Sequence, residues 1–278
     1  MMTTVNFVPV LPEILLLCGA CVVLLGDLFL SDARRQLSFW TTQVVLAAAA
    51  WGALASMQVA PGTAFSGMVV DDMLSDTLKF ISCGAVSLML FYSRDYCGAR
   101  GLFRGETFVL TLFALLGMMV MIAAGSFVTL YLGLELLGLS LYAMVAMYRT
   151  SNAATEAAMK YFVLGALASG ILLYGMSMIY GATGSLDIVV VAKALATGQG
   201  NRTILLFGLV FVVSGVAFKL GAVPYHMWVP DVYDGAPTAV TLLIGTAPKL
   251  AAYAFMLRLL GVALGSLWFD WQGMLIVL

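Results

Sequence analysis

Long apolar runs separated by short polar segments repeat along almost the whole chain. A helix needs about 20 mostly apolar residues to span a membrane. By that rule the pattern predicts eight spanning helices, at residues 8–30, 37–57, 77–96, 106–124, 127–148, 157–182, 203–224 and 237–262. A ninth run starts near Gly265 and reaches Leu278 before it is long enough to span. We therefore expect an all-α, polytopic membrane protein that is a fragment of a longer polypeptide.

Composition agrees with this pattern. The chain is 63% hydrophobic and 10% charged, whereas a soluble domain has about 25% charged residues. A soluble fold could not hide so much apolar surface, so membrane lipid must surround most of it. The net charge of −1 gives no electrostatic basis for binding nucleic acid. The first run carries Glu13 in place of a basic leader, which predicts a retained membrane helix.

The charged loops predict an orientation. Arginines follow the first, third and fifth predicted helices: Arg34, Arg35, Arg94, Arg100, Arg104 and Arg149. The loop after the second helix is acidic instead, with Asp71, Asp72 and Asp76 ahead of Lys79. Because positive loops favour the cytoplasmic side, we expect the N-terminus on the outer, periplasmic side.

Cysteine and histidine usage argues against a redox centre. Cys18 and Cys21 form a C-x-x-C inside an apolar run, where we interpret them as small core residues. Iron–sulfur clusters and structural zinc sites need about four ligands. The chain has four cysteines without such spacing and one histidine. We expect no cofactor or metal in this chain.

Three charges lie near the middle of predicted spanning helices: Glu135, Lys219 and Lys249. A charged residue at the centre of a membrane helix costs about 2.5–3.5 kcal/mol to insert. These groups must therefore face the bundle interior, a water-filled path or each other. A buried ion pair that only fixes packing is the simpler alternative, but such pairs stabilise weakly. Intramembrane ionisable residues more often mark a pathway for ions or protons.

The chemistry available to these groups is proton transfer. Burial disfavours the charged form of a lysine, and a nearby carboxylate favours it. A Glu135–Lys219 pair would therefore be a two-state proton site. Helix breakers accompany both lysines, because Gly221 and Pro224 follow Lys219 and Pro248 precedes Lys249. Broken helices are typical of ion sites in transporters, although ordinary proline kinks are also common in membranes.

Two further residues are weaker candidates. His226 lies between the two central lysines in the sequence and titrates near physiological pH, so it could relay protons or simply pack. Lys160 lies about one turn inside the sixth predicted helix. It could be a proton entry point, or its ammonium group could simply reach the water at the membrane surface. Asp231 and Asp234 precede the eighth helix, where we expect them to cap it.

The stretch FKLGAVPYHMWVPDVYDGAPTAV at residues 218–240, followed by TAPK at 246–249, resembles the antiporter-like membrane subunits of respiratory complex I. The wider family includes Mrp-type sodium/proton antiporters and membrane-bound hydrogenase subunits. LPEILLLCGACVVLLGDLF at residues 11–29 carries the same resemblance. Members of the family have about fourteen helices that include two inverted five-helix repeats.

The resemblance implies an organisation and a set of site residues. Residues 1–100 would be an N-terminal three-helix region, 101–263 the first five-helix repeat with a broken seventh helix, and 264–278 the start of a second repeat. The proton-carrying positions of the family match five residues here: Glu135, Lys160, Lys219, His226 and Lys249.

The resemblance also implies a function. The chain would be a proton-translocating subunit of a bacterial NADH:quinone oxidoreductase, multi-pass in the inner (plasma) membrane and surrounded by other membrane subunits of that complex. NADH, FMN, iron–sulfur clusters and quinone would be bound by partner subunits. One alternative is a stand-alone Mrp-type sodium/proton antiporter subunit, and another is a structural membrane scaffold.

Overall fold

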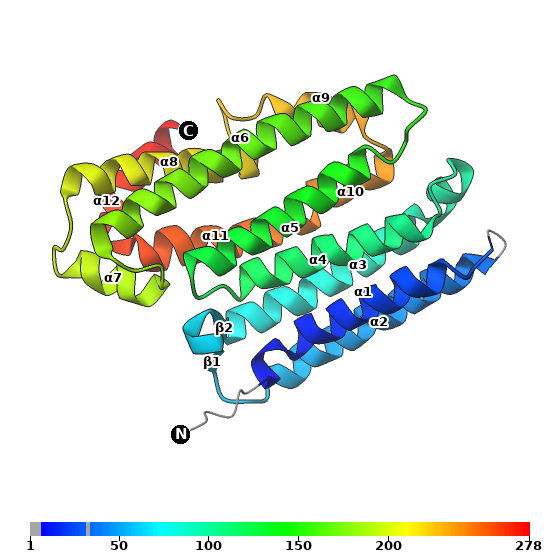
Figure 1. Cartoon of the computed structure of the whole chain (residues 1–278), viewed down its shortest axis with the longest axis horizontal. Helices are drawn as coiled ribbons and strands as arrows, with labels where there is room; N and C mark the ends of the chain where they lie inside the picture. Colours follow the sequence, from blue (N-terminus) through cyan, green and yellow to red (C-terminus); the bar gives the residue numbers. More distant parts are fainter. Residues whose placement is uncertain (1–6, 32–33) are drawn as a thin grey trace.

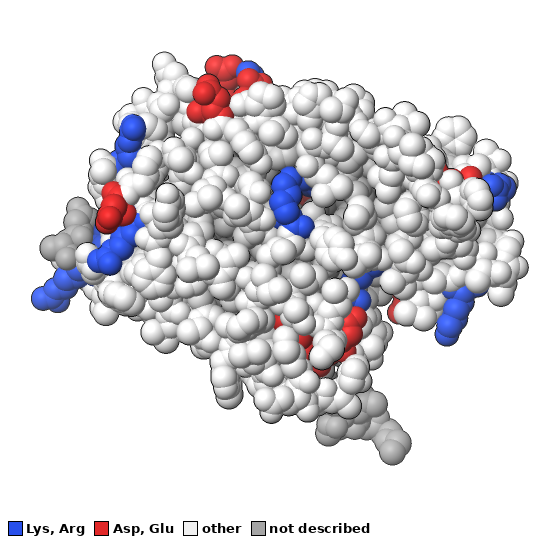
Figure 2. All heavy atoms as spheres, turned by 180° about the vertical axis from the view of Figure 1, so that it is seen from behind, with Lys and Arg blue, Asp and Glu red and all other residues white. Residues whose placement is uncertain are grey.

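The computed structural model of the protein describes residues 7–31 and 34–278. Within them, eight helical segments are long and apolar enough to cross a membrane: Val8–Asp27, Gln36–Ser56, Met73–Ala99, Gly105–Ile122, Phe127–Val145, Asn152–Thr183, Arg202–Leu220 and Thr238–Ala263. They fall where the eight apolar runs lie, so the prediction of a polytopic helical membrane protein is confirmed. Figure 2 shows one face of the molecule, which is largely uncharged, with Lys, Arg, Asp and Glu in a few separate patches.

The described part of the chain contains thirteen helical elements of at least seven residues. They are α1 (Leu11–Asp27), α2 (Gln36–Ser56), α3 (Met73–Ala99), α4 (Gly105–Ile122), α5 (Phe127–Val145), α6 (Asn152–Thr183), α7 (Ile188–Ala196), α8 (Arg202–Leu220), α9 (Trp228–Gly235), α10 (Thr238–Gly245), α11 (Ala247–Met256), the π-helical η4 (Leu257–Ala263) and α12 (Trp268–Val277). Figure 1 shows the long helices side by side, from α1 and α2 at one edge to α6 and α8 at the other.

The connection between α2 and α3 is a small β-hairpin, which sequence reasoning had treated as an acidic loop. Strand β1 (Gly62–Ala64) pairs antiparallel with β2 (Val69–Asp71). The Val70 N–H donates to the Ala123 carbonyl at 2.8 Å, beyond the end of α4. The hairpin therefore ties the N-terminal helices to the α4–α5 turn.

Helices α4 and α5 pack backbone to backbone. A Cβ added to Gly117 would lie 2.5 Å from the Leu137 nitrogen, and one added to Gly133 would lie 2.7 Å from the Met121 nitrogen. Contacts this short leave no room for a side chain, so glycine is required at both positions. This approach fixes α5, which carries Glu135, against the centre of the bundle.

The seventh and eighth spanning segments are both interrupted. Helix α8 ends at Leu220, four residues before the predicted end, because Gly221 adopts a left-handed conformation with φ 73°. The chain becomes helical again at Trp228. In the eighth segment α10 stops at Gly245, and α11 begins with Pro248 in its first turn. The predicted breaks are therefore present beside both central lysines.

The connection between the sixth and seventh spanning segments contains the short helix α7. The interpretation of Cys18 and Cys21 as core residues was wrong, because both thiols are exposed on α1. Their exposure is possible because this face of α1 is not covered by other helices of the chain. Cys83 and Cys97 are the buried cysteines.

Candidate proton site

The two central lysines line one small cavity in the middle of the bundle. Lys219 comes from the last turn of α8, and Lys249 from the first turn of α11. The cavity has a volume of about 50 Å³. Since about 10–15 Å³ of such space admits one water, it has room for more than one. Residues from α4, α5, α6, α9 and α10 contribute to its wall, among them Met121, Leu134, Leu137, Tyr161, Trp228 and Ile244.

The interruption of α8 gives Lys249 its hydrogen-bond partner. The last carbonyl groups of a helix have no partner within the helix. Lys249 Nζ donates to one of them, the Leu220 carbonyl, at 3.0 Å. Irregular backbone at membrane depth is tolerated where such a partner satisfies it. The break and the lysine are therefore parts of one arrangement that joins two spanning segments.

Glu135 lies close enough to Lys219 to act on it electrostatically. The glutamate is half-buried on α5, and its Oε1 is buried without a hydrogen-bond partner. The described contacts include no direct ion pair between the two side chains. A carboxylate in this position favours the charged form of Lys219 but does not form a direct ion pair with it.

An aromatic series connects α5 to the broken end of α8. The Tyr142 ring meets Tyr161 edge-on at 4.6 Å, and Tyr161 stacks on Trp228 at 4.8 Å. Trp228 Nε1 donates to the Phe218 carbonyl at 3.0 Å, one residue before Lys219. Sequence reasoning did not select Tyr161 or Trp228. Trp228 lies within the stretch at residues 218–240 that carries the family resemblance, but nothing in the sequence distinguishes it there. A single tyrosine in an apolar helix, such as Tyr161, does not indicate a site.

His226 is not brought into the cavity. It lies in the turn between α8 and α9 with its side chain exposed. Its backbone carbonyl accepts a hydrogen bond from the Val229 N–H at 2.9 Å. Lys219 and Lys249 share the cavity without it. The turn that follows Gly221 directs this residue away from the position between the lysines that its place in the sequence suggested.

Lys160 lies at the edge of the bundle, with a 41% exposed side chain. Its Nζ is 2.8 Å from Glu156 on the same helix and 3.2 Å from Asp231 on α9. Asp231 therefore pairs with α6, and the expectation that it caps the eighth helix was wrong. The first backbone N–H of α10, from Thr238, donates to the Tyr96 hydroxyl at 3.1 Å.

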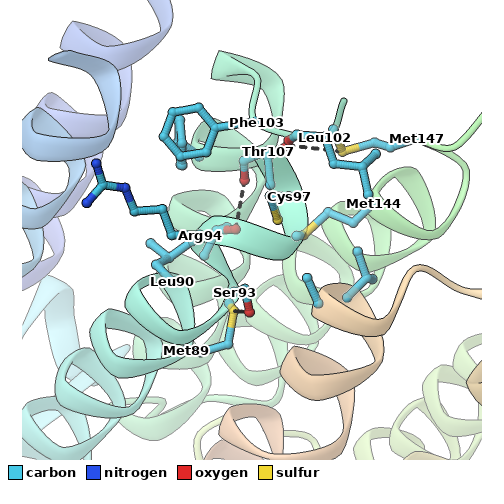
Figure 3. Close-up of a pocket in the computed structure, with 14 residues that line it drawn as sticks. Met89, Leu90, Ser93, Arg94, Cys97, Leu102, Phe103, Thr107, Met144 and Met147 are labelled. Atoms are coloured by element: carbon cyan, nitrogen blue, oxygen red, sulfur yellow. Dashed lines mark hydrogen bonds between the residues drawn. The ribbon is translucent and has the colours of Figure 1, made fainter. Parts of the chain in front are cut away.

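A second cavity, shown in Figure 3, has a different character. It lies where α3, α4, α5 and α10 meet and has a volume of about 20 Å³. Methionine sulfurs and the Cys97 thiol point into it, and Arg94 is the one charged residue in its wall. Arg94 contacts Gln36 and the face of the Phe39 ring instead. Without a carboxylate or a second cation, this cavity offers no site for proton exchange.

Sequence reasoning missed a second set of buried charges. Lys79 on α3 is fully buried, and its Nζ lies 2.8 Å from Glu13 Oε1 on α1. Asp71 and Asp76 are 3% and 2% exposed. These residues had been assigned to a helix end and a loop, where water is usually available. The packing of α1, α2 and the hairpin around α3 removes that water.

A family model described as "NADH:quinone oxidoreductase/Mrp antiporter, TM" matches residues 124–278, more than half of the chain. The chain belongs to this family. The resemblance carried by residues 218–240 is thereby confirmed. Among residues 7–31 and 34–278, no group of three or more His, Cys, Asp or Glu is arranged to hold a metal ion.

Individual relatives in the NADH:quinone oxidoreductase/Mrp antiporter family are similar over the whole chain. NADH-quinone oxidoreductase subunit N of Thiobacillus denitrificans is 56% identical over 277 residues, which are 100% of this chain and 57% of that protein. A chain of respiratory complex I from Thermus thermophilus superimposes with a TM-score of 0.74 at 31% identity, over 89% of this chain and 52% of that one. The chain thus spans just over half the length of the relatives it matches.

The Mrp complex from Dietzia sp. contains a chain of the same fold, with a TM-score of 0.74 over 92% of this chain and 48% of that one. The identity is 22%, so this likeness concerns the fold alone. The helices, their interruptions and the family match together establish an antiporter-like membrane fold.

Proposed function

We propose that this chain is the N-terminal part of a proton-translocating membrane subunit of a bacterial NADH:quinone oxidoreductase. The observation that carries the proposal is the shared cavity of Lys219 and Lys249, with Glu135 in electrostatic range of Lys219. The 56% identity to an NADH-quinone oxidoreductase subunit N supports this complex over a free-standing antiporter. NADH, FMN, iron–sulfur clusters and quinone would then be bound by partner subunits, and quinone reduction there would drive the protons.

The proton steps follow from the positions of the groups. A charged Lys219 is favoured while Glu135 is ionised and close. When the charge of Glu135 is withdrawn or neutralised, Lys219 releases a proton to water in the cavity. A neutral Lys249 accepts that proton, and its ammonium form donates to the Leu220 carbonyl. Each transfer leaves one lysine charged, so the cavity never holds two adjacent cations.

The remaining assignments belong to the same proposal. Residues 1–100 form the three-helix region, 101–263 the first repeat and 264–278 the start of a second one. The N-terminus faces the periplasm, because the arginine-rich loops would face the cytoplasm. His226 and Lys160 are peripheral candidates for proton entry or exit, since both are exposed.

The test uses the full-length protein in membrane vesicles. Lys219→Met and Lys249→Met are each compared with Lys193→Met, which removes an exposed lysine from α7. We expect NADH-driven acidification of the vesicles to fall at least about tenfold for the first two, while the control keeps wild-type activity. Normal acidification by both central variants at normal assembly would contradict the proposal.

The Mrp-type antiporter remains the second candidate, because the family description includes it and the fold of an Mrp complex matches. Co-purification decides between them. Recovery of the tagged full-length protein with NADH-oxidising, quinone-reducing subunits supports the proposal. Recovery with a set of small antiporter subunits instead, together with sodium-dependent proton exchange, would replace it.

A further inference from the structure

Arg258 is a buried arginine that the proton steps proposed above do not use. It lies in the eighth spanning segment, on the π-helical η4 that directly continues α11. It does not line the cavity of the two central lysines. A charged residue inside a spanning segment costs free energy to insert, and π-helical turns are rare and frequent at functional sites. Both features indicate that Arg258 does more than fill the core.

The guanidinium group of Arg258 joins its own segment to the ends of two other helices. Its Nε donates to the carbonyl of Ile122, the last residue of α4, at 2.6 Å. Its Nη2 lies 3.1 Å from each carboxylate oxygen of Asp72, the N-cap residue of α3. The last carbonyl groups of a helix lack partners within the helix and carry partial negative charge, so both contacts suit a cation. Charge-assisted hydrogen bonds of this kind are about twice as strong as neutral ones.

The packing of α11 itself is apolar and shallow. At its start, Thr246 with φ −117° and ψ −84° separates it from α10. Its buried residues are mostly alanines: Ala247, Ala251, Ala252, Ala254 and Phe255. Apolar contacts are non-directional, and short alanine side chains form low ridges that interdigitate little with a neighbouring helix. The hydrogen bonds of Arg258 therefore supply directional contacts that oppose sliding of α11 along its axis.

Lys249 depends on the position of α11 along that axis. It lies nine residues before Arg258 on the same helical segment, about 13 Å away at 1.5 Å per residue. Its Nζ donates to the Leu220 carbonyl of α8 at 3.0 Å. Because a hydrogen bond is lost at about 3.6 Å, a slide of α11 by about 1 Å would break this contact.

We propose that Arg258 is a positioning residue for proton transfer in the cavity of the central lysines. Its contacts with Asp72 and the Ile122 carbonyl hold α11 where Lys249 reaches both the cavity and the Leu220 carbonyl. The inference rests on the proposed function, because that function gives Lys249 its place in the proton path. Through Asp72, the N-terminal helices contribute to the geometry of a cavity that they do not line.

The test uses the full-length protein in its membrane complex. Arg258→Met removes both contacts, whereas Asp72→Asn removes only the charged partner, since asparagine can still cap α3. Arg202→Met is the matched control, because it breaks an ion pair with Asp270 in which the Arg202 side chain is 72% exposed. Electron cryo-microscopy should show α11 displaced by about 1 Å and the Lys249–Leu220 hydrogen bond broken in the first two variants, but not in the control.

Proton movement is measured on the same preparations. A misplacement of about 1 Å can slow a reaction about 100-fold, so acidification per assembled complex should fall at least about tenfold for Arg258→Met. Arg258→Lys gives a readout that a purely structural role would not move. Lysine keeps the charge but lacks the planar fork that reaches both partners. This variant should assemble like the wild type and acidify at a level between the wild type and Arg258→Met.

The outcomes separate this inference from the proposed function. An unmoved α11 in assembled Arg258→Met would overturn the inference. If that variant does not assemble, an unmoved α11 in Asp72→Asn would overturn it instead. Normal acidification by Lys249→Met would contradict the proposed function, and the position of α11 in the Arg258 and Asp72 variants would still decide whether Arg258 holds this helix in place.

Discussion

The half-buried Lys249 and the fully buried Lys79 occupy contrasting environments. Lys249 lies beside a helix interruption, where a free backbone carbonyl and a small cavity receive its head group. Lys79 lies in the uninterrupted helix α3, where its side chain is fully buried and a carboxylate from α1 approaches it. The first arrangement solvates a lysine with neutral groups, which allows either protonation state. The second fixes the lysine as a cation because its partner is charged.

This contrast predicts that the two sites fail differently when the lysine is removed. Loss of Lys79 should damage stability first, because it leaves buried carboxylates without a cation. Loss of Lys249 should damage proton movement first, because its neutral partner tolerates an uncharged neighbour.

Lys79→Met is expected to have the largest effect. Removing one partner of a buried ion pair costs about 3–5 kcal/mol, which is enough to reduce assembly. The measurement is the amount of full-length protein in the membrane and its thermal unfolding in detergent. The double variant Glu13→Gln/Lys79→Met removes both charges and should recover much of the loss. A single variant as stable as the wild type would remove the contrast between the two lysines.

Trp228→Phe is expected to have an intermediate effect. The substitution keeps an aromatic ring against Tyr161 but removes the Nε1 donor from the buried Phe218 carbonyl. The Phe218 carbonyl keeps the Gly221 N–H as a donor at 3.0 Å, so the lost hydrogen bond costs about 0.5–1.5 kcal/mol, and the smaller ring adds the cost of a void at a buried position. Thermal unfolding measures the change, with Trp51→Phe as control because the Trp51 side chain is 64% exposed on α2. Equal effects of the two substitutions would show that the end of α8 does not depend on this hydrogen bond.

Lys249→Met should change stability by only about 1 kcal/mol. It leaves the Leu220 carbonyl without its lysine, but the cavity has room for a replacing water. Acidification of vesicles should nevertheless fall strongly, as proposed above. Measuring assembly and acidification on the same preparation separates the two effects. A collapse of assembly as severe as that of Lys79→Met would show that both lysines are structural.

Lys160→Met should have the smallest effect on stability. Its ion pairs with Glu156 and Asp231 are exposed, and exposed pairs contribute little. The variant should assemble like the wild type, with a melting temperature that changes no more than that of Lys193→Met. A selective loss of acidification at normal assembly would make Lys160 a proton entry point, whereas unchanged acidification would make it a surface contact between α6 and α9.

The sequence predicted those structural features whose physical cause lies within a single helix or loop. The eight spanning helices follow from the lengths of apolar runs, because a single run must satisfy its own backbone in lipid. The interruption after Lys219 follows from Gly221, whose left-handed conformation ends α8, and the one before Lys249 accompanies Pro248. The charged residues at mid-helix could also be predicted, because the free-energy cost of inserting a charged residue into the membrane depends on its position within one helix.

Only the tertiary structure decided which partners these groups have. Lys249 reaches a carbonyl 29 residues away, Lys79 loses all exposure through α1 and the hairpin, and His226 turns outward although it follows Lys219 closely. Hydrophobic pattern and helix breakers act within one segment. Partners and burial depend on how segments distant in sequence pack, and close glycine contacts such as Gly117 against α5 set that packing. The sequence therefore determined which membrane helices carry charged residues, and helix packing determined which of those residues contact each other.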